Sequence, residues 1–458
     1  MALKALDIFK LTPKKNCKDC GFPTCMAFSM KVASGAVEVG KCPHMSDDAI
    51  AKLSEATAPL MKSLKVGAGE AEYTLGGETV LFRHEKTLVS RNRFAVKFCD
   101  CMSEEAVDAK IENMKLVDYV RIGEEMKAEF ALVKYNGNKD AYVSLINKLK
   151  ESELKIAYII DCEDVAVAKE AVQLLEGTNP IVYGANKENF NDMINVVKGG
   201  NLALGVKANS LEELYSTVEA IQGAGYKELI LDVTGETIKD TYTNAVQVRR
   251  IALKEQDRTF GYPSIIFANQ LSNNDPMMEV ALSSVFTVKY GSIIVLDDID
   301  YAKALPLFAL RQNIYTDPQR PMRVEPKIYP INNPDENSPV VVTVDFALTY
   351  FIVSGDIERS KVPCWLVIPD AGGYSVLTSW AAGKFGGNSI ASFIKECGIA
   401  EKTNNRDLII PGKVAVIKGD LEENLPDWNI IIGTEESMEI PKFLKEYQAK
   451  KSEELAKA

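Results

Sequence analysis

The stretch Lys14-Lys15-Asn16-Cys17-Lys18-Asp19-Cys20-Gly21-Phe22-Pro23-Thr24-Cys25, completed by Cys42-Pro43, decides how the N-terminal part of this chain folds. Its four cysteines follow the spacing C-x2-C-x4-C-x16-C. Two cysteines separated by two residues can reach one metal centre from a single tight turn, and Gly21 and Pro23 suit such a turn. Four thiolate ligands fit either Zn²⁺ or an iron–sulfur cluster.

The asymmetric spacing of these cysteines favours a 4Fe–4S cluster over zinc. Structural zinc sites usually combine two close cysteine pairs, or one pair with two histidines. Here three cysteines are bunched, and the fourth is distant and precedes a proline, which is typical of ferredoxin-like clusters. A disulfide is disfavoured, because the mixed polar N-terminus does not resemble a signal peptide and therefore predicts a reducing, cytoplasmic environment. Zinc stays open as the alternative.

The composition sets bounds on size and partners. A chain of 458 residues predicts about three domains. The formal net charge of -11 argues against nucleic acid and anionic membranes as partners, and no apolar run is long enough to span a bilayer. The two histidines, His44 and His84, both lie in the first fifth of the chain. The remainder therefore holds no histidine-based triad, metal cage or acid–base catalyst.

The chain divides into segments of different character. Residues 1–57 are predicted to form the cluster domain, and residues 58–92 a linker with a hairpin at Leu75–Glu78. Residues 93–315 alternate short apolar runs with helical stretches, which predicts parallel strands joined by right-handed crossovers. About nine candidate strands, Tyr119–Ile122 among them, fit a (β/α)8 TIM barrel with one strand counted in excess. An open doubly wound sheet is the alternative.

Several barrel strands end in polar residues: Asp161, Asn186, Asn209, Asp232 and Asn269. In a TIM barrel the C-terminal strand ends face the active site, so these side chains could bind a polar ring such as a pterin. The alternative, which we favour, is that they cap the following helices. The other cysteines of this region are expected mainly as buried packing residues. The pair in Cys99-Asp100-Cys101 could be a ligand pair, but packing is the favoured interpretation.

The C-terminal part predicts a second α/β domain. Residues 316–335 are proline-rich and are predicted to be a linker. In residues 336–458 the strand ends carry glycine and small hydroxyl residues, which leave room for a large flat ligand at the edge of the sheet. The loop Asp370–Gly373 is expected to bind phosphate or amide groups, or to be a plain tight turn. The charged tail from Lys442 onward is expected to be a solvent-exposed helix.

Three parts of the sequence together resemble one family. They are KKNCKDCGFPTCMAF with GKCP, the β/α middle, and the stretches VTVDFALTYF, IPDAGGYSVLTSWAAGKFGGNSIASFI and NIIIG. They resemble the large (gamma) subunit family of the corrinoid/iron–sulfur protein of the acetyl-CoA (Wood–Ljungdahl) pathway, over essentially the whole chain. The resemblance implies an α/β protein with a small helical 4Fe–4S domain, a TIM barrel and a C-terminal Rossmann-like corrinoid-binding domain.

The resemblance also implies the site residues. Cys17, Cys20, Cys25 and Cys42 would ligate the cluster, and no side chain is assigned as catalytic. The corrinoid would lie along Thr343, Phe346, Thr349, Asp370, Ala371, Gly372, Gly373 and Gly433. Because the C-terminal domain contains no histidine, the cobalt would be base-off, without a protein nitrogen ligand below it. That arrangement favours reduction to nucleophilic Co(I), and a low-potential cluster could return the electron after stray oxidation to Co(II).

The implied function is that of a methyl carrier, a component of a corrinoid-dependent methyltransferase system. It would accept methyl from methyltetrahydrofolate through a separate methyltransferase and deliver it to acetyl-CoA synthase. The implied partners are the small (delta) subunit, the methyltetrahydrofolate methyltransferase, acetyl-CoA synthase and a reductive activator. Two alternatives stay open: a pterin-binding barrel methyltransferase acting in cis, and an iron–sulfur electron-transfer module.

Overall fold

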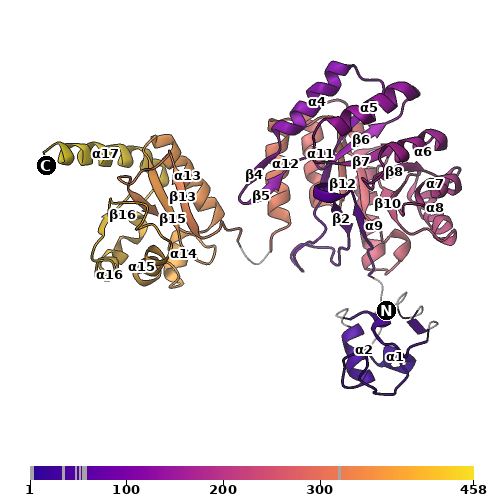
Figure 1. The fold of residues 1–458 in the computed structure, drawn as a ribbon, viewed down its shortest axis with the longest axis horizontal. Coiled ribbons are helices and arrows are strands. Elements are labelled where there is room, and N and C mark those ends of the chain that lie inside the picture. The colour runs from indigo at the N-terminus through magenta and orange to yellow at the C-terminus, as the bar shows by residue number, and fades with distance from the viewer. Residues whose placement is uncertain are drawn as a thin grey trace. The chain divides into compact units, whose positions relative to one another are not determined.

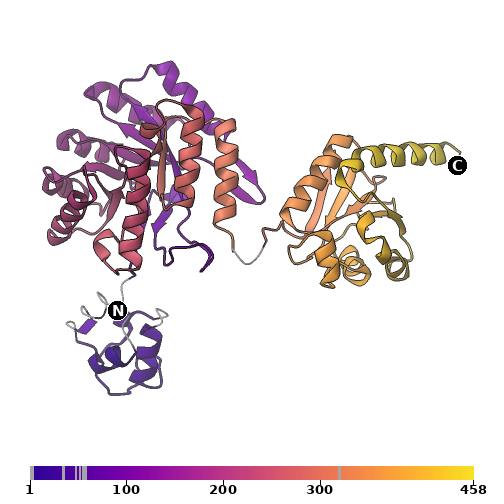
Figure 2. The ribbon, with the colours of Figure 1, turned by 180° about the vertical axis from the view of Figure 1, so that it is seen from behind.

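The computed structural model describes residues 5–33, 37–46, 49–50, 53, 59–317 and 321–457. The chain separates into two compact units (Figures 1 and 2). The first comprises Met1–Asp118 and Lys127–Tyr315, and the second comprises Tyr119–Met126 and Thr316–Ala458. Among the described residues, no helix combines the length and the apolar character needed to cross a bilayer.

The N-terminal module of the first unit is small and helical. Helix α1 (Ala5–Leu11) packs against α2 (Cys25–Ala33), and the 3-10 helix η1 spans Val39–Lys41. The Thr24 hydroxyl accepts a hydrogen bond from the Ala27 amide, which satisfies one of the free N–H groups at the start of α2. The module has a hydrophobic core of its own, which includes Ile8, Phe28 and Val32.

The middle of the chain is a closed barrel of eight parallel strands (Figure 1). Its strands are β3 (Arg93–Cys99), β6 (Phe130–Lys134), β7 (Ala157–Asp161), β8 (Ile181–Ala185), β9 (Leu204–Val206), β10 (Leu229–Asp232), β11 (Ser264–Phe267) and β12 (Ile293–Leu296). The barrel closes where β12 pairs with β3. This confirms the predicted (β/α)8 barrel and rules out the open sheet.

Helices follow the barrel strands in turn. They are α4 (Glu104–Leu116), α5 (Lys139–Glu151), α6 (Val165–Leu174), α7 (Phe190–Val197), α8 (Leu211–Gly223), α9 (Ile238–Leu253), α10 (Ala268–Leu271), α11 (Pro276–Val288) and α12 (Tyr301–Ile314). Most begin at a residue whose side-chain oxygen accepts from the first turn, such as Ser103, Asp164 and Thr237.

The strand counted in excess is Tyr119–Ile122. It forms β4 (Tyr119–Arg121), which pairs antiparallel with β5 (Glu124–Met126). Ile122 and Gly123 both have positive φ in the two-residue turn between them, as tight hairpins require. By compactness this hairpin belongs to the second unit and not to the barrel.

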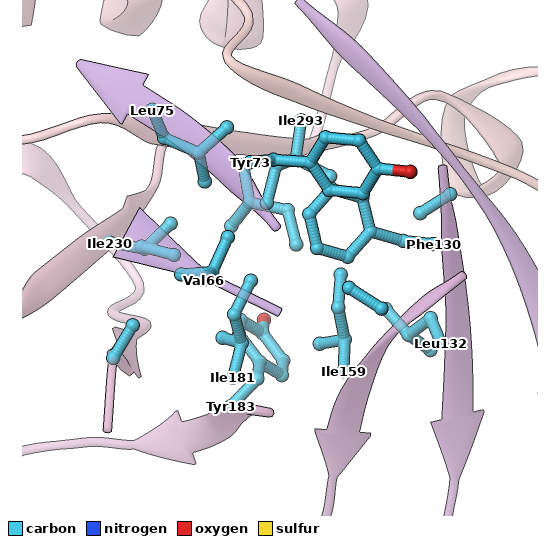
Figure 3. Close-up of a cluster of buried hydrophobic side chains, with 14 of the residues drawn as sticks. Val66, Tyr73, Leu75, Phe130, Leu132, Ile159, Ile181, Tyr183, Ile230 and Ile293 are labelled. Carbon is cyan, nitrogen blue, oxygen red and sulfur yellow. The ribbon is translucent and has the colours of Figure 1, made fainter. Parts of the chain in front are cut away.

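Residues 58–92 are not a linker, because part of this segment is barrel core. Strand β1 (Ser63–Val66) pairs antiparallel with β2 (Tyr73–Gly76). Leu64, Val66, Tyr73 and Leu75 belong to one buried cluster with residues of the barrel strands (Figure 3). The turn lies between Val66 and Tyr73, not at the predicted Leu75–Glu78.

This β1–β2 ribbon closes the N-terminal end of the barrel. The Gly67 amide donates to the Asn179 carbonyl oxygen over 2.9 Å, and the Lys62 amide donates to that of Gly261 over 2.8 Å. Asn179 and Gly261 lie in loops that lead into β8 and β11. The Tyr73 ring packs on the ring of Phe130, 5.5 Å between centroids. The segment predicted to be a linker therefore contains a two-stranded ribbon that covers the N-terminal end of the barrel and is part of its core.

The second unit contains a five-stranded sheet in the order β13-β15-β14-β16-β17. The strands are β13 (Lys327–Ile331), β14 (Val340–Val342), β15 (Cys364–Ile368), β16 (Asp407–Ile410) and β17 (Asn429–Ile432). Only β13 is antiparallel to its neighbour in the sheet. Because β13 lies within residues 316–335, that segment is not wholly the predicted linker.

Helices cover both faces of this sheet. They are α13 (Ala347–Ser360), α14 (Val376–Ala381), α15 (Gly387–Glu396), α16 (Lys418–Asn424) and α17 (Ile440–Lys457). One buried cluster joins Val340 and Val342 to residues of α15 and α16, and another joins Val341 to residues of α13 and α17. Successive residues of β14 thus point to opposite cores, as in any strand buried on both faces.

Candidate functional site

All four predicted ligand cysteines lie in the N-terminal module, which remains the predicted cluster site. Cys25 is the first residue of α2, and Cys42 follows η1. Cys20, Cys25 and Cys42 are buried, whereas Cys17 is exposed. Cys20 and Cys42 are members of the module's hydrophobic core. The site therefore has three sheltered thiols and one at the surface.

The loop that carries the first two cysteines has an unusual backbone. Lys14, Asn16, Lys18 and Gly21 have φ of 55°, 47°, 70° and 83°. Left-handed residues that alternate with right-handed ones form concave nests of N–H groups around anionic centres, including iron–sulfur clusters, and the positive φ values of this loop are compatible with such a nest. The Asn16 side-chain oxygen accepts from the Cys25 amide over 2.8 Å, which ties the loop to the start of α2.

The separation of the thiols fits a cluster better than a single ion. A tetrahedral Zn²⁺ with bonds of about 2.3 Å holds its sulfurs roughly 4 Å apart. Among the described residues, no three of these four Sγ atoms lie within 4.8 Å of one another. A cube of iron and sulfide spreads its four thiolates more widely, so the lack of a close set of sulfurs disfavours a single Zn²⁺ ion, and the four thiol donors suit an iron–sulfur cluster.

Cys17 has two polar neighbours, Asp19 and His44, which the sequence did not predict as a group. Asp19 Oδ2 lies 2.6 Å from His44 Nε2, and one ligand atom from each of Cys17, Asp19 and His44 lies within 4.8 Å of the others. Hydrogen bonds from His44 and then from Cys17 lower the pKa of Asp19. The proximity of Asp19 and His44 to ligand cysteines in sequence was the signal available.

The second unit has a cleft at the point where its strand order reverses. The chain crosses from β14 to β15 on one side and later returns to β16 on the other. Ligands of open α/β sheets bind beyond the C-terminal strand ends at such a reversal. A cleft of about 300 Å³ lies there, bordered by the ends of β14, β16 and β17 and by α13, α14 and α17.

Three of the residues predicted to contact the corrinoid line this cleft: Thr343, Thr349 and Gly433. Thr343 is 2% exposed, and its hydroxyl has no hydrogen-bond partner in the described part of the protein. A buried hydroxyl without a partner is costly unless a ligand satisfies it. Ile352 and Leu377 also line the cleft, yet remain 45% and 48% exposed.

The loop Asp370–Gly373 is not among the residues that line the cleft. The amides of Ala371 and Gly373 donate to Oδ1 of the fully buried Asp345, and the Gly372 amide donates to Asp370 Oδ1. These N–H groups are therefore engaged within the protein, which removes the expected anion-binding loop. Phe346 precedes α13 and also lies outside the cleft lining.

The C-terminal tail contributes to the cleft. Phe443 and Leu444 of α17 line it, and Leu444 is 1% exposed. The expectation of a solvent-exposed helix from Lys442 onward is therefore wrong for its first turns. This helix is highly charged, but it has apolar residues at helical spacing, which indicate a buried face: Ile440, Phe443 and Leu444.

Comparisons with known proteins cover almost the whole chain. A family model described as "CO dehydrogenase/acetyl-CoA synthase delta subunit" matches residues 63–444, and one described as "Putative Fe-S cluster" matches residues 13–44. The chain is 37% identical over 443 residues to the corrinoid/iron-sulfur protein large subunit of Moorella thermoacetica, covering 97% of this chain and 98% of that one. This chain belongs to the corrinoid/iron–sulfur protein large-subunit family.

Archaeal members of the large-subunit family carry a different name. The acetyl-CoA decarbonylase/synthase complex subunit gamma of Methanopyrus kandleri is 34% identical, covering 96% of this chain and 97% of that one. Among solved structures, dihydropteroate synthase of Thermus thermophilus superposes with a TM-score of 0.37 at 14% identity, covering 54% of this chain and 97% of that one. That likeness is too slight to carry an argument.

In this member of the large-subunit family, the barrel mouth holds partly buried carboxyls. Burial raises the pKa of Asp161 to about 6 and raises that of Asp232. The Tyr183 hydroxyl donates to Asp232 Oδ2 over 2.5 Å. Asn186 and Asn209 line a separate hollow of about 260 Å³ with Lys207.

The polar strand-end residues do not act as helix N-caps, which was the favoured interpretation. The caps of α6, α8 and α9 are Asp164, Ser210 and Thr237. Asp232 instead accepts from the Thr234 amide, and so shapes the turn that follows β10.

Cys99 and Cys101 of this large-subunit chain are joined by a disulfide at the end of β3. Cys99 is buried and Cys101 is exposed. The expectation of two simple packing residues is therefore wrong.

Proposed function

We propose that this chain is the methyl-carrying subunit of a corrinoid-dependent methyltransferase system, with a 4Fe–4S cluster in its N-terminal module and a corrinoid on its C-terminal unit. When bound, the corrinoid supplies the cobalt that takes and releases the methyl group, and the cluster supplies the electron that keeps the cobalt reactive. The single observation that carries the proposal is the unpartnered Thr343 hydroxyl in a cleft at the sheet's reversal point. Membership of the large-subunit family supports it.

In the N-terminal module, Cys17, Cys20, Cys25 and Cys42 are the proposed cluster ligands. The positive-φ residues of the Lys14–Gly21 loop suit a nest of N–H groups, which would stabilise a centre of negative charge. The core around Cys20 and Cys42 excludes water from one side of the centre. The exposed Cys17 leaves the other side open for electron exchange.

In the C-terminal unit, the sheet is a Rossmann-like corrinoid-binding fold under this proposal. The cleft is much smaller than a corrinoid, so it would hold only part of the cofactor. The exposed Ile352 and Leu377 supply an apolar seat there. Thr343, Thr349 and Gly433 would contact this part of the cofactor, and Phe346 and the loop Asp370–Gly373 are proposed to contact it outside the cleft.

The partners follow from the same proposal. The chain takes methyl from methyltetrahydrofolate by way of a separate methyltransferase and delivers it to acetyl-CoA synthase, all in the cytoplasm. It assembles with a small (delta) subunit and is served by a reductive activator. With histidines only at positions 44 and 84, residues 336–458 offer the cobalt no imidazole ligand.

Metal analysis of anaerobically purified protein tests the proposal directly. We expect iron and cobalt together, with the visible bands of a corrinoid and the electron paramagnetic resonance signal of a reduced 4Fe–4S cluster. Cys17→Ala is expected to lose the cluster and block reductive reactivation, while methyl transfer by chemically pre-reduced protein continues. Zinc in place of iron, or an absence of cobalt, would contradict the proposal.

A further inference from the structure

The N-terminal module carries a concentration of positive charge that its function as a cluster holder does not require. Residues 1–46 contain seven lysines against Asp7, Asp19 and Glu38, although the whole chain has a net charge of -11. Four of these lysines adjoin the proposed cluster ligands. Lys14, Lys15 and Lys18 lie within three residues of Cys17, and Lys41 immediately precedes Cys42. We name Lys14, Lys15, Lys18 and Lys41 the basic rim.

The basic rim is exposed, and its charges are not neutralised nearby. All four side chains are exposed, as is Cys17 between them. Within the described residues, no carboxylate forms an ion pair with Lys14, Lys15 or Lys18, whereas Lys10 pairs with Asp7 over 3.0 Å. Lys41 lies over the Phe22 ring, 5.6 Å from its centroid, and Lys14 over the Phe9 ring at 5.8 Å. These aromatic contacts position the charges without cancelling them.

We propose that the basic rim is the docking surface for an acidic electron-carrier protein that reduces the cluster. This inference rests on the proposed function, because it requires a cluster behind Cys17. In the step, one electron leaves the reduced iron–sulfur centre of the donor and enters the cluster of this chain, so the donor is oxidised and the cluster reduced. No atom is transferred.

The arrangement suits a brief encounter. Electron-transfer complexes have small interfaces, and complementary charge raises their association rate more than their affinity. The exposed Cys17 lies between Lys15 and Lys18 in the sequence, so the part of the cluster that it ligates would be the part a donor docked on the basic rim reaches. The other three proposed ligands are buried, which leaves Cys17 as the accessible ligand. An acidic donor is selected because the rest of the chain, being strongly negative, repels it elsewhere.

The test uses the full chain with its cluster, in anaerobic stopped-flow reduction followed at the cluster's visible absorbance. The variant Lys14→Glu/Lys15→Glu/Lys18→Glu is compared with wild type. An acidic two-cluster ferredoxin, chemically reduced beforehand, is the donor. We expect the second-order rate constant at low salt to fall by about tenfold or more, and the difference to shrink as added salt screens the charges.

Two small reductants, one uncharged and one cationic, test whether the change in rate depends on the charge of the donor. Photoreduced 5-deazariboflavin is uncharged and should reduce the variant and wild type at equal rates. The methyl viologen radical is cationic and should reduce the variant faster than wild type. A control variant reverses three exposed lysines of the barrel surface, Lys169→Glu/Lys198→Glu/Lys254→Glu, and should leave the ferredoxin rate unchanged. Calorimetric binding of oxidised ferredoxin gives a readout that needs no turnover, and we expect the rim variant to lose it.

Each outcome is decisive. Equal ferredoxin rates for the rim variant and wild type, with iron content intact in both, would overturn the inference. Unchanged cluster reduction with slower onward reduction of cobalt would also overturn it, because the rim would then serve the C-terminal unit of the same chain. Should the glutamate variant lose iron, the triple variant Lys14→Gln/Lys15→Gln/Lys18→Gln replaces it, and we expect a smaller fall in the rate constant for reduction by ferredoxin. If wild type itself holds no iron, the proposed function fails first.

Discussion

Thr343 and Asp345 stand two residues apart in the same loop after β14. They differ in how far their side-chain oxygens are satisfied by hydrogen bonds within the protein. Asp345 is fully buried; its Oδ1 accepts from the amides of Ala371 and Gly373, whereas its Oδ2 has no hydrogen-bond partner among the described residues. Thr343 is nearly as buried, but its hydroxyl has no partner. Asp345 thus stabilises the loop Asp370–Gly373 through one oxygen, whereas Thr343 has no other side-chain polar atom and keeps an unmet hydrogen bond in the cleft.

Thr343→Val separates these two kinds of contribution. Valine has nearly the same shape, so the ligand-free protein is expected to gain about 1 kcal/mol of stability from the lost unsatisfied hydroxyl. Corrinoid retention, measured as cobalt content after gel filtration, is expected to fall. The control Thr349→Val changes a partly exposed residue of the same cleft and should alter stability by less than about 0.5 kcal/mol. A destabilised ligand-free Thr343→Val protein would show that the hydroxyl serves the fold.

The partly buried Asp161 predicts a pH dependence of stability. Because burial raises its pKa to about 6, the folded protein binds this proton more tightly than the unfolded chain does. Its contribution is therefore fully present below about pH 4 and is lost as pH rises through about 6. At pH 8, Asp161→Asn should increase the free energy of unfolding by roughly 1–3 kcal/mol and so raise the thermal midpoint. Near pH 4 the substitution should leave the midpoint unchanged.

The control for this prediction is Asp164→Asn. Asp164 is an exposed carboxyl three residues further on, and asparagine keeps the N-cap acceptor of α6. We expect this substitution to change stability by less than about 0.5 kcal/mol. A midpoint for Asp161→Asn below that of wild type at pH 8 would mean that the charged carboxylate is stabilised within the barrel.

At the scale of elements, the regular part of the chain was predictable and its exceptions were not. The barrel follows from strands and helices that alternate in sequence, and the cluster module from cysteine spacing, because both signals are local. The β1–β2 ribbon has only four residues in each strand, and its burial comes from barrel strands up to about 230 residues away. The hairpin at Tyr119–Met126 has the composition of a barrel strand but pairs only with itself.

The residues around the cleft show the same limit. Thr343 and Gly433 were named from the family resemblance, and both follow strands whose ends can be located from sequence; the structure places both in the cleft lining. Phe443 and Leu444 were not, because their helix is charged along most of its length and its apolar face is short. Asp345 was missed because its role depends on amides that only the folded loop brings to it.

The turn of the ribbon offers a matched pair of substitutions. Gly67 and Gly69 both have positive φ, but an added Cβ would lie 1.9 Å from the Ala71 carbonyl oxygen at Gly67 and would meet nothing within 4 Å at Gly69. Gly69→Ala should cost about 1–2 kcal/mol for its left-handed backbone alone. Gly67→Ala should cost at least about 2 kcal/mol more, measured by urea unfolding of the full chain. Equal costs would argue that the ribbon does not stabilise the barrel.

At the scale of the whole molecule, the protein is built from separate cores. The cluster module, the barrel interior and the two faces of the C-terminal sheet each have their own buried clusters. A fragment of residues 59–458 is therefore expected to fold without the cluster module. It should contain cobalt but no iron, and its barrel should melt within a few degrees of the full chain by circular dichroism. Aggregation of this fragment would show that the module is needed for folding.

The β1–β2 ribbon also has a consequence for biosynthesis. Its apolar residues Val66, Tyr73 and Leu75 leave the ribosome early, yet they pack beside Ile265 and Ile293, which are translated some two hundred residues later. Until β12 is synthesised and the barrel closes, the apolar residues of this segment cannot be buried and stay exposed to solvent. A nascent chain of this protein should thus be a client for chaperones that shield hydrophobic stretches, and its release from them should coincide with completion of the barrel.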